Sequence, residues 1–310
     1  MARSERQVPS VYFGRPGALV TLPWPRGDLG KSYERQTSDF VTGTGQHAVQ
    51  MATLGSRSYV VNWNALHQDT FSLIEQYSSG NMGVGPWTLI DPSAPNLLLP
   101  NQSSATNNSY DLTGIATSTG AASMGTPLSN TDPANIHRTG ATRSIRWQFV
   151  AAAAGSPTLV FGSPYRNWFG IPAVVGLPYS WSFWAKPDGV VDSAITLSAR
   201  IQWLDATGAQ LSESTGGDVS ATGWLRFTCT ATAPANAAYA RPVIVSTSAT
   251  ITTGASIYAD EFLFEQDSVV NNWAPGTGVR AVEILSLPET APFAARFRTG
   301  ITLALRELAS

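Results

Sequence analysis

Lysine and charge of either sign are scarce in this 310-residue sequence. Only 13% of the residues are charged, the formal net charge is -2, and Lys31 and Lys186 are the only lysines. Such a chain has no broad basic surface to neutralise the phosphates of DNA or RNA. Nucleic-acid binding is therefore not expected.

Cysteine and long apolar runs are equally sparse. Cys229 is the single cysteine, and its alternation with Leu225 and Phe227 predicts a small core residue on a strand rather than a disulfide partner. No apolar run reaches the roughly 20 residues that a membrane-spanning helix needs. The start of the chain, MARSERQVPS, is polar, so we expect neither a membrane span nor a secretory signal.

Motifs for catalysis are missing as well. Glycoside hydrolysis requires two carboxylates that flank one bond, and the acidic residues here are scattered without a paired motif. His47 lies near a predicted strand start, His67 in a predicted helix and His137 in a loop, without metal-ligand spacing. Neither a Gly-x-Ser-x-Gly elbow nor a phosphate-cradling loop occurs. We therefore expect no enzyme activity.

The apolar runs that do occur are short, alternate with polar residues and are separated by turn residues, which is typical of a mainly β protein. The exception is residues 64–77, whose apolar residues lie near helical spacing. Asn64 is the expected N-cap of this helix and Gly80 its C-terminal stop. Strands are expected around it at residues 11–13, 18–24, 47–55, 57–63 and 85–91.

A second region begins near residue 96. It opens with a stretch rich in Ser, Thr, Asn and Gly that reads as loops to about residue 140. Strands then follow at the regular spacing of a β-sandwich, at residues 143–149, 158–161, 179–185, 194–204, 224–233, 239–246 and 256–266.

Two further strands are expected after the breaker-rich residues 271–278, at 279–287 and 295–308. An isolated hairpin is marginally stable in water, so these strands should return to the sheet of the first region. This arrangement predicts a discontinuous domain of residues 1–95 and 277–310, with residues 96–276 inserted into it.

The inserted region resembles carbohydrate-binding modules of the four/nine type, as found in minor tail proteins of actinobacterial phages. The stretches that carry the resemblance occur in order at 95–98 (PNLL), 177–186 (LPYSWSFWAK), 202–208 (QWLDATG), 223–227 (GWLRF) leading to 233–241 (APANAAYAR), and 258–262 (YADEF). The resemblance implies a jelly-roll sandwich. Such modules often hold a structural calcium ion, and Asp260, beside Glu261, matches the position of the usual acidic ligand. The spacing of the acidic residues here forms no calcium-loop motif. No other cofactor is expected.

The flanking parts are similar to the distal tail family of long-tailed phages, through their layout and residues 87–92 (WTLIDP). The combined fold class is mainly β: a tail-tube-like β domain with one α-helix, plus the inserted sandwich. The resemblance implies a ring, usually of six copies, at the tail tip. Its partners would be other copies of the chain and the tube, tape measure and baseplate hub proteins, within a virion whose parts are made in the host cytoplasm.

Candidate sugar-contacting residues follow from the need for aromatic faces and planar polar groups. In residues 179–184, alternation assigns Tyr179, Trp181 and Phe183 to the core and turns Trp184 the other way. On the strand 195–203, Arg200 and Gln202 face outward, either as an ordinary wet face or as a binding face. In the loop 163–170, the candidates are Tyr165, Arg166, Trp168 and Phe169, which either bind a ligand or pack against the end of the sandwich.

These observations favour a non-enzymatic virion protein of the tail tip, a ring or baseplate hub component that contacts host cell-surface glycans. One alternative is a glycan-binding accessory module of a bacterial carbohydrate-degrading protein. Another is purely structural tail decoration, in which the sandwich binds no sugar.

Overall fold

The computed structural model of the chain contains two compact units. It describes residues 10–25, 29–34, 37–41, 44, 46–51, 56–91, 94–103, 114–117, 128–139, 141–149, 156–163, 165, 168–188, 195–247, 253–288, 291–293 and 297–308. Unit 1 is built mainly of Pro92–Val279; unit 2 consists of Pro9–Arg15, Leu19–Asp91 and Arg280–Ser310. The chain thus leaves unit 2 after Asp91 and returns to it at Arg280.

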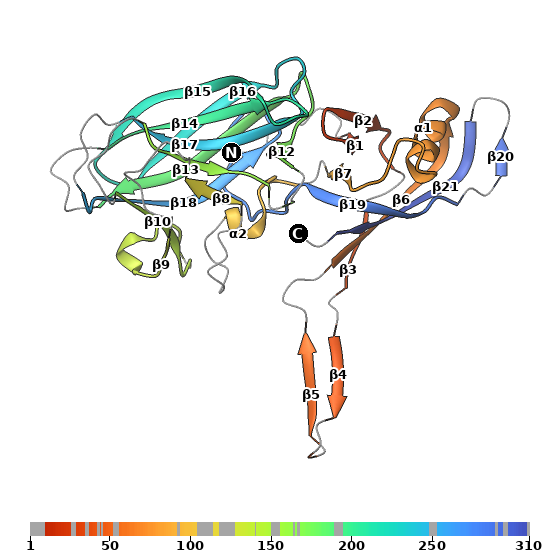
Figure 1. The fold of residues 1–310 in the computed structure, drawn as a ribbon, viewed down its shortest axis with the longest axis horizontal. Helices are drawn as coiled ribbons and strands as arrows, with labels where there is room; N and C mark the ends of the chain where they lie inside the picture. The colour runs from red at the N-terminus through yellow and green to blue at the C-terminus, as the bar shows by residue number, and fades with distance from the viewer. Residues whose placement is uncertain are drawn as a thin grey trace. The chain divides into compact units, whose positions relative to one another are not determined.

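An eight-stranded sheet is the main element of the described part of unit 2 (Figure 1). Its order is β2 (Ala18–Leu22), β1 (Val11–Arg15), β7 (Trp87–Ile90), β19 (Arg280–Ser286), β21 (Phe297–Glu307), β6 (Ser56–His67) and β3 (Gly30–Glu34), with β20 (Ala291–Phe293) paired to β21. β19 pairs with β7, and β21 pairs with β6. The prediction that the C-terminal strands return to the first sheet is confirmed. A separate hairpin joins β4 (Thr37–Val41) to β5 (His47–Met51).

The longest helix in the described part of the chain, α1 (Gln68–Ser78), begins later than predicted. Asn64 is not its N-cap but part of β6, which continues to His67 because β21 pairs with it throughout that stretch. His67 caps the helix instead, through an Nδ1 that accepts a hydrogen bond from Asp69 N at 3.4 Å. The expected stop is confirmed, since Gly80 follows the helix with φ +80°, a left-handed conformation that suits glycine.

One face of α1 packs onto the unit 2 sheet. Its buried residues are Phe71, Ile74 and Tyr77, which recur every three positions and so share a face. The Tyr77 ring meets Phe13 and Trp87 edge-on, with centroid distances of 5.5 and 4.8 Å. Burial of each such side chain stabilises the unit by roughly 1.5–3 kcal/mol. No helix in the described part of the chain is long and apolar enough to span a membrane.

Unit 1 is a β-sandwich of two sheets. One runs β16 (Leu225–Thr232), β13 (Pro178–Pro187), β18 (Ser256–Glu265), β10 (Ser144–Gln148) and β9 (Leu128–Asn130). The other runs β15 (Gln210–Ala221), β14 (Ile195–Leu204), β17 (Tyr239–Ser246), β11 (Thr158–Phe161) and β8 (Ile115–Thr117), with β12 (Ile171–Pro172) beside β17. Two short helical turns, α2 (Pro100–Ser103) and η1 (Pro133–Asn135), lie in its connections.

The sandwich core is aromatic. Tyr179, Trp181 and Phe183 on β13 are fully buried, as predicted for core residues. Cys229 lies in the same interior as a free thiol, and burial raises its pKa to about 11. It is therefore the small core residue that its pattern predicted, protonated at neutral pH.

The two ends of the inserted segment lie side by side. Buried Asn96 donates from Nδ2 to the carbonyl oxygens of Phe262 and Ala274, at 2.9 Å each. Its own carbonyl accepts from Thr277 N at 3.0 Å, and Val279 N donates to Leu97 O at 3.3 Å. Neighbouring termini are what insertion into another domain requires.

Candidate functional site

A row of hydrogen-bonded polar side chains crosses the outward face of β15, β14 and β17. Arg200 donates from Nη1 to Glu213 Oε1 at 2.8 Å, and Gln202 Nε2 donates to Glu213 Oε2 at 2.9 Å. Gln202 Oε1 in turn accepts from Arg241 Nε at 3.0 Å and Nη2 at 2.7 Å. A fifth side chain, Asp218, approaches Arg200 at 3.8 Å. We call Arg200, Gln202, Glu213, Asp218 and Arg241 the polar row.

Strand alternation and register place this row. On β14, Leu197, Ile201 and Trp203 are buried in the core, so Arg200 and Gln202 project from the opposite side. Gln202 lies opposite Glu213 on β15 and opposite Arg241 on β17. Three adjacent strands therefore bring their polar side chains to one line, where each fixes the orientation of the next.

An exposed aromatic ring lies beside the strand that carries Arg241. Phe169 is 48% exposed, and its ring meets Tyr239 edge-on with a centroid distance of 5.9 Å. Tyr239 precedes Arg241 by two positions on β17, so the two side chains belong to the same face. Burial of Tyr239 raises its pKa to about 12, so it is a neutral hydrophobic support for the Phe169 ring.

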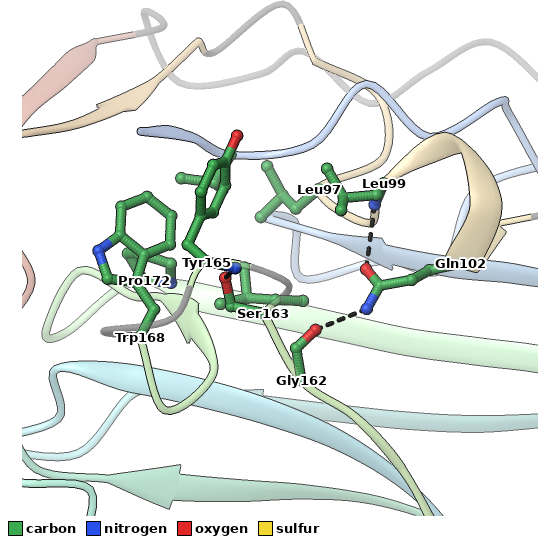
Figure 2. A pocket seen from close by; sticks show the side chains of 10 residues that line it. Leu97, Leu99, Gln102, Gly162, Ser163, Tyr165, Trp168 and Pro172 are labelled. Carbon is green, nitrogen blue, oxygen red and sulfur yellow. Dashed lines mark hydrogen bonds between the residues drawn. The ribbon is translucent and has the colours of Figure 1, made fainter. Parts of the chain in front are cut away.

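The other described aromatic residues of the 163–170 loop are packed inward. Tyr165 and Trp168 are only 8% and 7% exposed, and their rings contact each other with a centroid distance of 4.7 Å. Figure 2 shows both rings in the lining of a small pocket, whose cavity volume is about 10 Å³. Gln102 lines it too, accepting from Leu99 N at 3.1 Å and donating to Gly162 O.

This pocket is smaller than the roughly 300–1,000 Å³ of typical ligand pockets. Tyr165 and Trp168 therefore pack against the end of the sandwich, which is the second of the two alternatives left open by the sequence. Arg166 lies outside the described residues. Of the predicted loop residues that are described, only Phe169 is available to a ligand on the sheet face.

Trp184 projects outward from β13 as predicted, but in the other sheet of the sandwich. The outer faces of two packed sheets point away from each other, so Trp184 does not join Arg200 and Gln202. His137 stacks on its ring, with a centroid distance of 4.1 Å and an angle of 18°, and also approaches Trp224 at 5.0 Å. One face of Trp184 is thereby already covered by the chain itself.

Asp260 and Glu261 lie where β13 and β18 lose register. Glu261 has φ +56°, uncommon for a non-glycine residue and suited to a bulge that re-aims its side chain. Its carboxylate is 3.6 Å from His137 Nδ1. Asp260 is fully buried and accepts from Glu261 N at 2.8 Å and Arg138 N at 3.2 Å, while burial raises its pKa.

These contacts tie the loop of residues 131–139 to the sheet. Within the described residues, no group of three or more His, Cys, Asp or Glu side chains is placed to hold a metal ion. Both Asp260 oxygens already accept backbone N–H groups. A calcium ion at Asp260 therefore gains no support from this arrangement and stays a prediction.

Three residues of the polar row, Arg241, Glu213 and Asp218, were missed from the sequence. Arg241 lies on a strand that was predicted, but its proximity to Gln202 depends on strand register. Glu213 belongs to β15, whose residues are almost all exposed and show no alternating apolar signal. The strand of Arg241 could be predicted from the sequence, but the partners of its side chain could not.

No family model matches the chain, and no curated protein matches it. Solved structures that resemble it include the enzymatically active domain of bacteriophage CBA120 tailspike protein 4, with 14% identity, 56% of this chain and 22% of that chain covered, and a TM-score of 0.37. The CBM22-1 xylan-binding domain of Paenibacillus barcinonensis Xyn10C is 13% identical, and the match covers 54% of this chain and 94% of that domain, with a TM-score of 0.38. TmCBM61, bound to β-1,4-galactotriose, is 12% identical, and the match covers 56% of this chain and 99% of TmCBM61, with a TM-score of 0.36. Likenesses of this strength assign no ligand, activity or assembly to this chain.

Proposed function

We propose that unit 1 is a glycan-binding module whose contact surface is the outward face of β15, β14 and β17. The polar row carries this proposal, because it presents two planar guanidinium groups and an amide already oriented by mutual hydrogen bonds. Such groups pair with sugar hydroxyls at a reduced cost in side-chain ordering. Phe169 adds an exposed ring for the apolar face of a sugar.

The role of the chain is to bind and to assemble, without catalysis and without a resident cofactor. In the favoured version it is a structural protein of a phage tail tip, where unit 2 assembles and unit 1 contacts host cell-surface glycans. The similarity of the flanking segments to distal tail proteins supports this version. A glycan-binding accessory module of a bacterial carbohydrate-degrading protein is supported about as well by the sandwich alone.

Glycan binding is tested with the full chain on an array of bacterial cell-wall and plant-type glycans. Arg200→Ala and Phe169→Ala should each weaken a positive interaction about ten-fold or more, since a charged hydrogen bond or a stacked ring contributes about 1–3 kcal/mol. Trp184→Ala, on the opposite sheet, should leave the affinity unchanged. Thermal melts of each variant control for folding.

Loss of binding in folded Trp184→Ala with retention in Arg200→Ala would place the site on the other sheet. Absence of any hit with the folded protein would favour the purely structural alternative.

The assembly role is tested by light scattering and negative-stain imaging of the purified 32.9 kDa chain. A tail-tip ring predicts a closed assembly, with six copies as the expected number from the family resemblance. A monomer that persists at high protein concentration contradicts self-assembly through unit 2.

A further inference from the structure

Arg241 is a cation of the polar row without a carboxylate partner in the described part of the chain. Its Nε and Nη2 both donate to the amide oxygen of Gln202, a neutral acceptor. Arg200, by contrast, pairs with Glu213 and approaches Asp218. The second terminal nitrogen of Arg241, Nη1, has no hydrogen-bond partner among the described residues.

The surroundings of Arg241 make this arrangement costly in the absence of a ligand. The side chain is half-buried, and burial lowers the pKa of its guanidinium, with no carboxylate among the described residues opposing the effect. Glu213 cannot turn to it without losing bonds, since both of its oxygens are held by Arg200 and Gln202. A partly desolvated charge is stabilised when an opposite charge pairs with it.

The charges of the row are unevenly balanced along its length. At the Arg200 end, two carboxylates face one guanidinium; at the Arg241 end, one guanidinium faces only an amide. The exposed Phe169 ring rests on Tyr239, the neighbour of Arg241 on the same face of β17. A stacking surface and an unneutralised cation therefore lie at the same end of the row.

We infer that the glycan bound by this face carries an anionic group, a uronate carboxylate or a phosphodiester, which Arg241 binds while the sugar ring stacks on Phe169. The planar guanidinium fork suits either group, because both present paired oxygens. This inference rests on the proposed function, to which it adds the charge class of the ligand.

The test is calorimetric titration of the full chain with matched pairs of acidic and neutral ligands. One pair is polygalacturonate and its fully methyl-esterified form, which share a backbone and differ in charge. The other is a glycosylated polyglycerol phosphate and the corresponding phosphate-free glycosylglycerol. The wild-type chain should bind the acidic member of at least one pair about ten-fold more tightly at low salt, with the preference shrinking as salt is added. The pair that shows the preference identifies the anionic group.

Arg241→Gln should abolish the preference, and Arg241→Lys should retain part of it, because the charge remains while the fork is lost. Arg146→Gln is the matched control, since it removes the same charge from β10 in the other sheet, where Arg146 Nε donates to Ser256 Oγ. Equal binding of acidic and neutral members by the wild-type chain overturns the inference but leaves glycan binding standing. A preference that survives in Arg241→Gln also overturns it. Binding to no glycan of either charge overturns the proposed function as well.

Discussion

At the scale of single residues, unit 1 contains acidic side chains that are buried yet hydrogen-bonded. Glu265 is 2% exposed; it accepts from Ser180 Oγ at 3.1 Å and from the backbone N and side-chain Nδ2 of Asn271 at 2.9 and 3.0 Å. Burial nevertheless raises its pKa above 4.5, because these donors only partly replace lost water. Burial is also the main cause that raises the pKa values of Asp260 and Glu261.

These shifts predict that mild acid stabilises unit 1. Between the ordinary pKa values of these acids and their raised values in the folded chain, the folded state binds more protons than the unfolded state. The free energy of unfolding therefore falls as pH rises through the raised values. We expect the Tm of unit 1 to be higher near pH 5 than near pH 8, by about 2–4 °C for each kcal/mol gained.

Circular dichroism melts across this pH range measure the effect. Glu265→Gln should flatten the dependence, because one of the titrating groups is removed. A Tm that is constant or lower at the acidic end would contradict the assignment of burial as the dominant cause.

The residues of the candidate site show how far alternation alone can predict side-chain position. It placed Arg200 and Gln202 outward on β14, and it turned Trp184 away from the core. It could not show that His137, from a distant loop, stacks on Trp184, or that Arg241 lies opposite Gln202. Both facts depend on contacts between segments far apart in the sequence, which local pattern does not encode.

At the scale of elements, the predicted strands are those with one apolar face. β13, β14, β17 and β18 were all predicted within a residue or two, since most of their side chains are buried in the sandwich and their apolar runs are bounded by turn residues. β15 was missed because nearly all of its residues are exposed, so it shows no period-two apolar signal. Its place depends instead on backbone pairing with β14 and on Gly216, where any Cβ would overlap Thr228 O.

The start of α1 was misplaced for a related reason. Residues 64–67 fit the helical spacing of the apolar residues that follow, yet they extend β6. Pairing with β21 supplies backbone hydrogen bonds that only the distant C-terminal strand can provide. Tertiary pairing therefore overrides the local pattern, and the helix begins where that pairing ends.

At the scale of the whole molecule, the discontinuous layout was predictable because two terminal strands cannot fold alone. The structure also shows which strands of unit 2 pair with each other across the inserted segment. Leu89 on β7 lies opposite Arg280 on β19, although the whole of Pro92–Val279 separates these strands in the sequence. The two strands are antiparallel neighbours, so a short turn could connect them directly.

Excision of Pro92–Val279, with a four- or five-residue Gly/Ser/Asn linker from Asp91 to Arg280, should therefore leave a folded unit 2 in which β7 and β19 form a hairpin. The expected result is cooperative unfolding with near-ultraviolet dichroism from the packed Phe13, Tyr77 and Trp87 rings. Ile74→Ala, which opens a cavity beneath α1, should destabilise the shortened protein by about 2–5 kcal/mol and lower the corresponding transition of the full chain. A shortened chain without cooperative unfolding would show that unit 2 requires the inserted segment, and the insertion would then be structural support as well as a second domain.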